Sequence, residues 1–317
     1  MSSSNKLIAV VGATGAQGGG LARAILADAG GGFAVRALTR KVDSANARAL
    51  AAAGAEVVVA DSDDEASLVR ALQGAHGAYF VTNFWEHLSP DREQAQAAAM
   101  ARAAKAAGVA HVVWSTLEDS RNFIPVGDPR MPTLMGRYKV PHFDAKGESD
   151  RFFAEAGVPT TYLLTSFYWE NLIFFGMGPK RAADGVLDWA MPLGSARFPG
   201  IAVEDIGRCA YGVFKRGAEL VGQRVGIAGE HLTGTEMAAA MADAFGEPVR
   251  YQALDPAVFR SFGFPGAEDL GNMFQFNIEF AADFCRQRDL ARSRALNPAL
   301  RTFAQWLAAN KARIPVG

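Results

Sequence analysis

Short apolar, β-branched runs alternate with alanine-rich segments through the first half of this 317-residue chain, and this alternation limits the possible folds more than any other feature. The runs have the length of strands and the alanine-rich segments have the length of helices. Such a succession gives parallel strands joined by right-handed crossovers. The expected strands are 7–13, 33–40, 56–61, 77–83, 111–116 and 160–166, and the expected helices are 17–29, 43–53, 65–73, 90–107 and 142–156.

The sequence therefore predicts an α/β fold with a doubly wound, parallel-sheet Rossmann domain. The expected strands are apolar on both faces, as in a sheet that helices cover on each side. The alternation ends near residue 167, where segments rich in Phe, Trp, Gly and Pro begin. We expect residues 1–166 to form the dinucleotide-binding domain and residues 167–317 to form a smaller α+β subdomain on the substrate or partner side, parts of which can interleave with the first.

Composition excludes several classes of protein. The chain carries 32 basic and 33 acidic side chains, a balance that gives no electrostatic footprint for nucleic acid. No apolar stretch reaches the roughly 18 residues of a membrane span, and the N-terminus has no signal-peptide pattern, so we expect a cytoplasmic protein. Cys209 and Cys285 are too few for a disulfide framework, and the five histidines show no metal-ligand spacing, so we expect no metal.

The stretch VVGATGAQGG follows the first expected strand and opens the first expected helix. Its Gly12, Gly15 and Gly18 form a G-x-x-G-x-x-G motif. In this context the glycines allow a tight turn and a close backbone approach to a pyrophosphate, which the helix N-terminus attracts. The alternative is a turn with only a structural role. The motif predicts a dinucleotide site.

The end of the second expected strand indicates which dinucleotide is bound. An NAD-binding fold places a carboxylate there, whereas this chain has Arg40 and Lys41. A guanidinium can grip a 2′-phosphate through two parallel hydrogen bonds, so we predict NADP(H). The alternative is a pair of solvated charges. Asp61, after the third strand, can reach the adenine edge, or it can cap the next helix, a role that Asp63 could fill equally well.

Taken together, these residues resemble the NmrA-like family, an atypical branch of the short-chain dehydrogenases/reductases, and within it the NADPH-sensor members. The resemblance extends over nearly the whole chain. In the nucleotide half it rests on GATGAQGG, ALTR, ADSDD and VTNFWE. In the second half it rests on PHFDAKGE, SFYWENL, GFPGAEDLGNMFQF and LNPALRTFAQWL.

The resemblance implies NADP(H) as cofactor and assigns residues to each part of it. Thr14, Gly15, Gln17 and Gly18 would hold the diphosphate, next to the turn at Gly12. Arg40 and Lys41 would take the 2′-phosphate, with Asp61 and Ser62 near the adenine. Thr82 and Asn83 would line the nicotinamide side, and Lys146 would bind the nicotinamide ribose. Tyr168, Glu170 and Asn171 would close over the nicotinamide end. The family pattern DQDD differs from Asp61-Ser62-Asp63-Asp64 at its second position.

The stretch HFDAK poses the main question about catalysis. A working short-chain reductase carries Y-x-x-x-K, in which the phenol is the acid, but here His142 stands four residues before Lys146. Tyr138 is two helical turns from Lys146, and Pro141 intervenes. An imidazole can donate a proton in place of the phenol. The pair could also be an ordinary solvated helix face.

Two functions remain open from the sequence. In the first, the protein is an NADPH-dependent oxidoreductase of a conjugated or cyclic small molecule of quinone, imine or enone type, with His142 as acid and Lys146 as ribose anchor. In the second, it is a non-catalytic NADPH/NADP⁺ redox sensor that regulates a protein partner. A homodimer is compatible with either function.

The substrate side is read from aromatic residues and one long loop. Residues 117–141 resemble a loop over the site, a candidate lid whose Arg121, Arg130, Arg137 and Lys139 we expect to be solvated. Several aromatic side chains could wall an apolar substrate pocket or could be ordinary core. They are Trp85, Phe123, Phe167, Tyr168, Trp169, Phe174 and Phe175.

Overall fold

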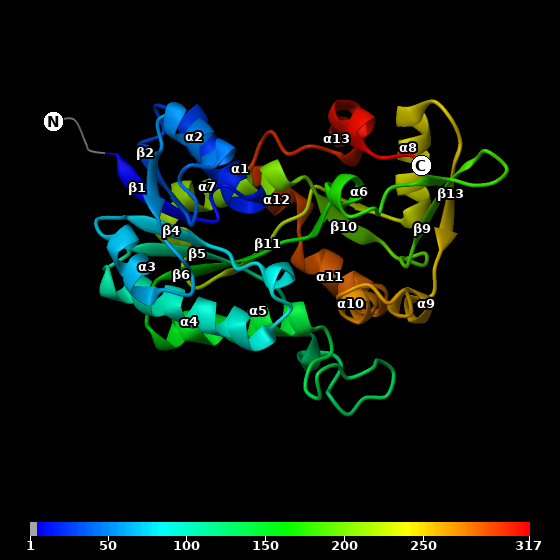
Figure 1. Cartoon of the computed structure of the whole chain (residues 1–317), viewed down its shortest axis with the longest axis horizontal. Helices are drawn as coiled ribbons and strands as arrows, with labels where there is room; N and C mark the ends of the chain where they lie inside the picture. The colour runs from blue at the N-terminus through cyan, green and yellow to red at the C-terminus, as the bar shows by residue number, and fades with distance from the viewer. Residues whose placement is uncertain (1–4) are drawn as a thin grey trace.

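A seven-stranded parallel sheet forms the centre of the computed structural model, which describes residues 5–317 (Figure 1). The strand order is β11-β6-β5-β4-β1-β2-β3. The strands are β1 (Lys6–Val11), β2 (Phe33–Thr39), β3 (Glu56–Val59), β4 (Gly77–Phe80), β5 (His111–Thr116), β6 (Thr160–Leu164) and β11 (Arg224–Gly226). All six strands expected from the sequence are present, and the predicted doubly wound α/β fold is confirmed.

Helices cover both faces of this sheet. One buried cluster joins the sheet to α1, α2 and α7 through Leu21, Leu50 and Ile206. A second cluster joins the opposite face to α3, α4 and α5 through Leu68, Met100 and Phe153. The bounds are α1 (Ala16–Ala27), α2 (Ala45–Ala52), α3 (Glu65–Leu72), α4 (Pro90–Ala106), α5 (Pro141–Glu155) and α7 (Val203–Arg216). The central strands β4 and β5 are thereby buried on both faces, whereas the edge strand β3 stays partly exposed.

Two of these elements come from beyond residue 167 and return to the sheet. β11 pairs in parallel with β6, and α7 packs against α1. The two helices meet backbone to backbone, because a Cβ built on Gly207 would lie 2.1 Å from the amide nitrogen of Leu21. The first domain is thus completed by the second half of the chain.

The remaining elements form a smaller α+β region, at the right of Figure 1. It has its own core, which contains Trp189, Phe274 and Trp306. Two three-stranded sheets have the orders β12-β10-β7 and β13-β9-β8. Their strands are β7 (Phe167–Tyr168), β8 (Lys180–Arg181), β9 (Leu187–Met191), β10 (Phe198–Ile201), β12 (Glu230–Leu232) and β13 (Val249–Ala253). The helices are α6 (Asn171–Phe174), α8 (Gly234–Phe245), α9 (Pro256–Arg260), α10 (Ala267–Glu279), α11 (Ala281–Gln287), α12 (Leu290–Leu296) and α13 (Phe303–Asn310), although α12 packs on α7.

Among residues 5–317, no helix combines the length and the apolar character that crossing a bilayer requires.

Candidate functional site

The glycine turn lies between β1 and α1, as the sequence predicts. Gly12 has a φ of +66°, and its carbonyl accepts the amide hydrogen of Gly15 at 2.9 Å. A Cβ built on Gly18 would lie 2.5 Å from the carbonyl oxygen of Gly12. Gly15 caps α1 without a side-chain hydrogen bond, and the first turn of α1 holds no acidic residue. The first turn of α1 therefore brings no carboxylate of its own to compete with an anion, and the turn fits a dinucleotide diphosphate.

Gly18→Ala tests this packing. The added methyl group would meet backbone atoms that cannot rotate away, so we expect a loss of about 1–3 kcal/mol in the free energy of unfolding. Chemical denaturation of the variant and the wild-type protein measures it. Gly30→Ala is the matched control, because a Cβ there has nothing within 4 Å. Equal stability of all three proteins would contradict the close approach.

The predicted 2′-phosphate ligands follow β2. Arg40 is exposed and donates two hydrogen bonds to Glu86, at 2.7 Å and 3.1 Å. This pairing raises the pKa of Arg40 and lowers the pKa of Glu86. Lys41 is exposed beside Arg40. Both cations directly follow the end of β2, as the sequence predicts. That they bind a phosphate stays a prediction.

On the predicted adenine side, Oδ1 of Asp61 accepts the amide hydrogen of Asp63 at 3.0 Å. The cap of α3 is Asp64, which accepts the amide hydrogen of Ser67 at 3.1 Å, so neither Asp61 nor Asp63 caps this helix. Asp63 instead binds Arg92 of α4, which lowers the pKa of its carboxyl group. Ser62, between Asp61 and Asp63 in the sequence, is half-buried.

Lys146 and Thr82 are brought into contact at the end of β4. Nζ of Lys146 lies 2.7 Å from Oγ1 of Thr82 and 2.7 Å from Oε1 of Glu93. Thr82 also donates to Glu93 at 2.6 Å, and Glu93 is fully buried. Asn83 follows Thr82 and is exposed. The lysine is thus fixed by a buried carboxylate of α4 that the sequence analysis missed.

Local sequence explains why α4 and α5 present these groups. Ser89 caps α4 and Pro90 occupies its first turn. Pro141 opens α5, while Asp144 in its first turn accepts the amide hydrogens of Lys139 and Val140 at 2.8 Å and 3.1 Å. These contacts fix the residue at which α5 starts. They thereby fix the directions in which the side chains of its first two turns point.

His142 lies one turn before Lys146 and is only 6% exposed. Its Nδ1 is 2.7 Å from Oδ1 of Asp269, and its backbone N–H donates to Oδ2 of the same carboxylate at 3.1 Å. The ring centroid of Trp85 is 4.8 Å from that of His142. Nε2 of His142 has no hydrogen-bond partner among residues 5–317. The alternative of a solvated helix face is wrong, because His142 and Lys146 are both buried.

Asp269 was also missed by the sequence analysis. It belongs to α10, 127 positions further along the chain, and it is 5% exposed. The carboxylate holds both the ring and the backbone of His142, so the imidazole has one fixed orientation. The arrangement can carry a proton on the ring nitrogen that Asp269 does not bind.

Gln17 lies beneath the tip of α1 rather than at its surface. Its amide binds the hydroxyl groups of Tyr79 and Tyr168, and its Oε1 accepts a hydrogen bond from Ser115 at 2.8 Å. Burial raises the pKa of both tyrosines, so both remain protonated at neutral pH. Through its side chain, Gln17 therefore ties β4, β5 and β7 to α1, which leaves its backbone for the predicted diphosphate contact.

Glu170 and Asn171 lie at the start of α6. Oε2 of Glu170 accepts the amide hydrogen of Val203 at 3.0 Å, and Oε1 accepts a hydrogen bond from Trp306 at 2.8 Å. Burial raises the pKa of this carboxyl group. Glu170 therefore anchors α7 and α13, and its predicted place near the nicotinamide stays untested, as does that of Asn171.

The aromatic residues and the expected lid separate into different environments. Trp169 belongs to the core, where its ring is tilted against those of Phe303 and Trp306, whereas Phe174 and Phe175 are about two-thirds exposed. The expected lid segment is fixed by internal hydrogen bonds. Lys139 is fully buried and donates to the carbonyls of Asp128 and Met131 at 2.7 Å and 2.6 Å. The expectation that Lys139 is solvated is therefore wrong, because these carbonyls replace water.

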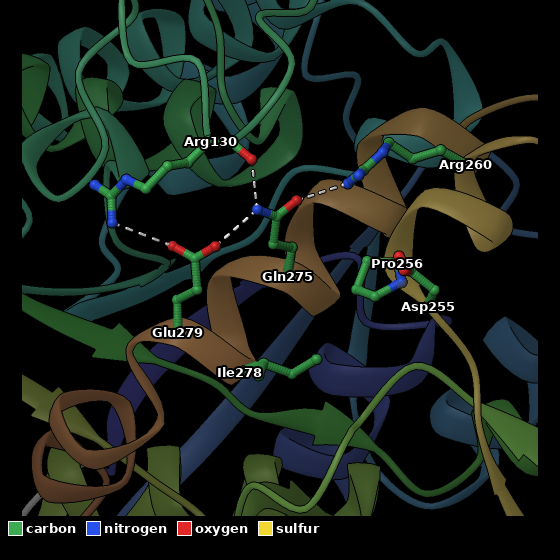
Figure 2. Close-up of a pocket in the computed structure, with 7 residues that line it drawn as sticks. All are labelled: Arg130, Asp255, Pro256, Arg260, Gln275, Ile278 and Glu279. Atoms are coloured by element: carbon green, nitrogen blue, oxygen red, sulfur yellow. Dashed lines mark hydrogen bonds and ion pairs between the residues drawn. The ribbon is translucent and has the colours of Figure 1, made fainter.

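The same segment packs on α10. Gln275 donates to the carbonyl of Arg130 at 2.7 Å and also binds Arg260 and Glu279, as Figure 2 shows. A pocket of about 300 Å³ opens here, lined by Arg130, Asp255, Pro256, Arg260, Gln275, Ile278 and Glu279. None of the predicted cofactor or catalytic residues lines it.

Comparison with known proteins gives the family. The model of the NmrA-like family matches residues 4–307. The chain belongs to the NmrA-like family. This confirms the resemblance seen in the motifs.

Named relatives agree with this membership. The NmrA-like oxidoreductase FrzB from Cladobotryum sp. is 31% identical over 85% of this chain and 83% of its own length. The NAD(P)H azoreductase of Xenophilus azovorans is 33% identical over 78% of this chain and 77% of its own. The solved structure of NmrA, a negative transcriptional regulator, in complex with NADP has a TM-score of 0.78 at 23% identity, over 96% of this chain and 95% of that one. That likeness shows a shared NmrA-like fold.

Proposed function

We propose that this NmrA-like protein binds NADP(H) along the carboxyl ends of the sheet strands. The turn from Gly12 to Gly18, which includes Thr14, and the tip of α1 hold the diphosphate. Arg40 and Lys41 bind the 2′-phosphate, and Asp61 and Ser62 lie near the adenine. The free amide tip and the two cations support this placement. At the other end of the dinucleotide, Lys146 binds the nicotinamide ribose, with Thr82 and Asn83 beside it.

The function we propose is the NADPH-dependent reduction of a conjugated or cyclic small molecule. When bound, the cofactor supplies a hydride. His142 supplies the proton that balances it from Nε2, and the imidazole is then reprotonated from water. Asp269 holds the ring in position through the hydrogen bonds to its Nδ1 and to the backbone of His142. Lys146, fixed by Glu93 and Thr82, orients the ribose.

The observation that carries this proposal is the buried pair of His142 and Asp269. His142 lies one helical turn before Lys146 on α5. Burying two ionisable groups is costly unless they are paired, and a buried histidine whose second nitrogen is unpaired is suited to proton transfer. Holding a dinucleotide requires no proton donor at this position, whereas reducing an acceptor does. The proposal therefore retains the acid function of the missing tyrosine and moves it to an imidazole.

The acceptor class follows from the ring environment and from one relative. Trp85 lies against His142 and is 39% exposed, so it offers a flat apolar surface beside the proton donor. The relative from Xenophilus azovorans is an NAD(P)H azoreductase. We propose a quinone, imine or enone, or a related azo compound, as the acceptor.

A second candidate function is a redox sensor that regulates a protein partner. It is favoured by the absence of the tyrosine of Y-x-x-x-K and by the Arg40–Glu86 pair, which joins the proposed phosphate site to the segment that touches His142. Such a sensor needs different affinities for its cofactor states.

Consumption of NADPH separates the two functions. We expect its absorbance to fall when the protein is mixed with at least one member of a panel of quinones, azo compounds, imines and enones. A calorimetric titration of NADPH in the same buffer establishes binding. Binding without consumption by any member of the panel would reject the reductase and leave the sensor. Absence of binding would reject both.

A further inference from the structure

Glu86 occupies the guanidinium edge to which we assign the 2′-phosphate. It belongs to the short helix η1 (Phe84–Glu86), and both of its oxygens accept hydrogen bonds from Arg40. A carboxylate and a phosphate compete for such a fork, and if both approach it they repel each other. The side chains of Arg40 and Glu86 are 54% and 42% exposed, so the pair is weak enough for a ligand to open.

The two residues before Glu86 contact the proposed proton donor. Phe84 is 2% exposed, with its ring centroid 5.9 Å from that of His142. Trp85 lies 4.8 Å from His142, centroid to centroid. It also fills the space over Gly266, the residue before α10, where a Cβ would lie 2.9 Å from Cζ3 of Trp85. Three successive residues of η1 therefore touch the end of β2, the helix α5 and the start of α10.

We propose that Glu86 is a specificity-determining residue that competes with the 2′-phosphate for Arg40 and couples phosphate capture to the position of Trp85. This inference rests on the proposed NADP(H) binding. A nucleotide with a 2′-phosphate releases Glu86, and η1 then loses its anchor at the end of β2. Trp85 then moves off Gly266 and becomes more exposed, while its ring stays beside His142. A nucleotide without that phosphate leaves the Arg40–Glu86 pair closed.

The first test is the affinity of Glu86→Gln for the two dinucleotides. Removal of the competing charge should tighten NADPH binding about three- to five-fold, the scale of one exposed ion pair, while NADH affinity changes less than about two-fold. Glu65→Gln is the matched control, because Glu65, 41% exposed, forms a similar surface pair with Arg102, 59% exposed. Its NADPH affinity should equal that of the wild-type protein.

The second test reports on Trp85 itself. The other four tryptophans (Trp114, Trp169, Trp189 and Trp306) are at most 1% exposed, so a collisional quencher such as acrylamide selects Trp85. Adenosine 2′,5′-bisphosphate should raise the quenching constant, whereas adenosine 5′-monophosphate, which lacks only the 2′-phosphate, should not. Glu86→Gln should show the raised constant without nucleotide. Trp85→Phe should lose the quenchable emission, which confirms its assignment.

The outcomes separate this inference from the proposed function. If wild-type protein binds no NADPH, the proposed function fails. If it binds NADPH, but Glu86→Gln and Glu65→Gln match it for both dinucleotides, only the role of Glu86 fails. An unchanged or lowered quenching constant with adenosine 2′,5′-bisphosphate overturns the movement of Trp85.

Discussion

Replacing Arg40 with glutamate should weaken NADPH binding by about 100-fold and leave NADH binding within a few-fold of the wild-type value. The substitution removes a charge-assisted fork and places a carboxylate beside the phosphate, and losses of this kind cost several kcal/mol. NADH carries no 2′-phosphate and therefore meets neither penalty. Calorimetric titration of both dinucleotides into the wild-type and variant proteins measures the ratio of the two losses.

The control for this variant is Arg102→Glu. Arg102 is exposed to a similar degree and also loses an ion pair with a glutamate, but no predicted site residue is its partner. It should bind both dinucleotides as the wild-type protein does. Equal losses of NADPH and NADH affinity in Arg40→Glu would mean that the guanidinium supports the site only generally, and the phosphate role would be withdrawn.

His142→Ala should lower kcat by about 10²- to 10³-fold for any acceptor that the wild-type protein reduces. This is the usual contribution of a positioned general acid. The affinity for NADPH should change less than about two-fold, because the proposed cofactor contacts belong to Lys146, Thr82 and the glycine turn. Steady-state rates with the best acceptor of the panel, combined with calorimetry, separate the two effects. An undiminished kcat would show that the proton comes from another group.

Asp269→Asn sharpens the same test. The amide oxygen can still accept the Nδ1 hydrogen of His142, but the NH2 group cannot accept the backbone N–H of His142 as Oδ2 does, and the negative charge beside the ring is lost. We expect kcat to fall on the order of 10-fold. Asp269→Glu, which retains the charge, should recover part of this loss. If both variants behave alike, Asp269 acts through packing rather than through charge. Thermal unfolding of each variant shows whether it is folded.

The parts of the molecule that follow from local sequence were predictable. The strands β1 to β6, the turn at Gly12 and the positions of Arg40 and Thr82 all follow from periodicity and from the rule that ligands meet the carboxyl ends of parallel strands. The contact between Lys146 and Thr82 is a consequence of the same topology.

The partners of these residues could not be predicted in this way. Asp269, Glu93 and Glu86 reach the site from α10, α4 and η1, and nothing near them in the sequence distinguishes them from surface acids. Glu93 stands in an alanine-rich helix that reads as solvated on one side, yet it is fully buried. Tertiary packing decides such contacts, and one sequence carries no record of them.

The backbone contact between Gly207 and Leu21 has a consequence for any shortened version of the chain. A fragment that stopped at residue 166 would keep the glycine turn and both phosphate-side cations. It would lack the helix that shields the apolar side of α1 and the strand that pairs with the edge of β6. An unprotected edge and an uncovered apolar surface favour aggregation, so the nucleotide half is no autonomous module and has to be studied within the intact polypeptide.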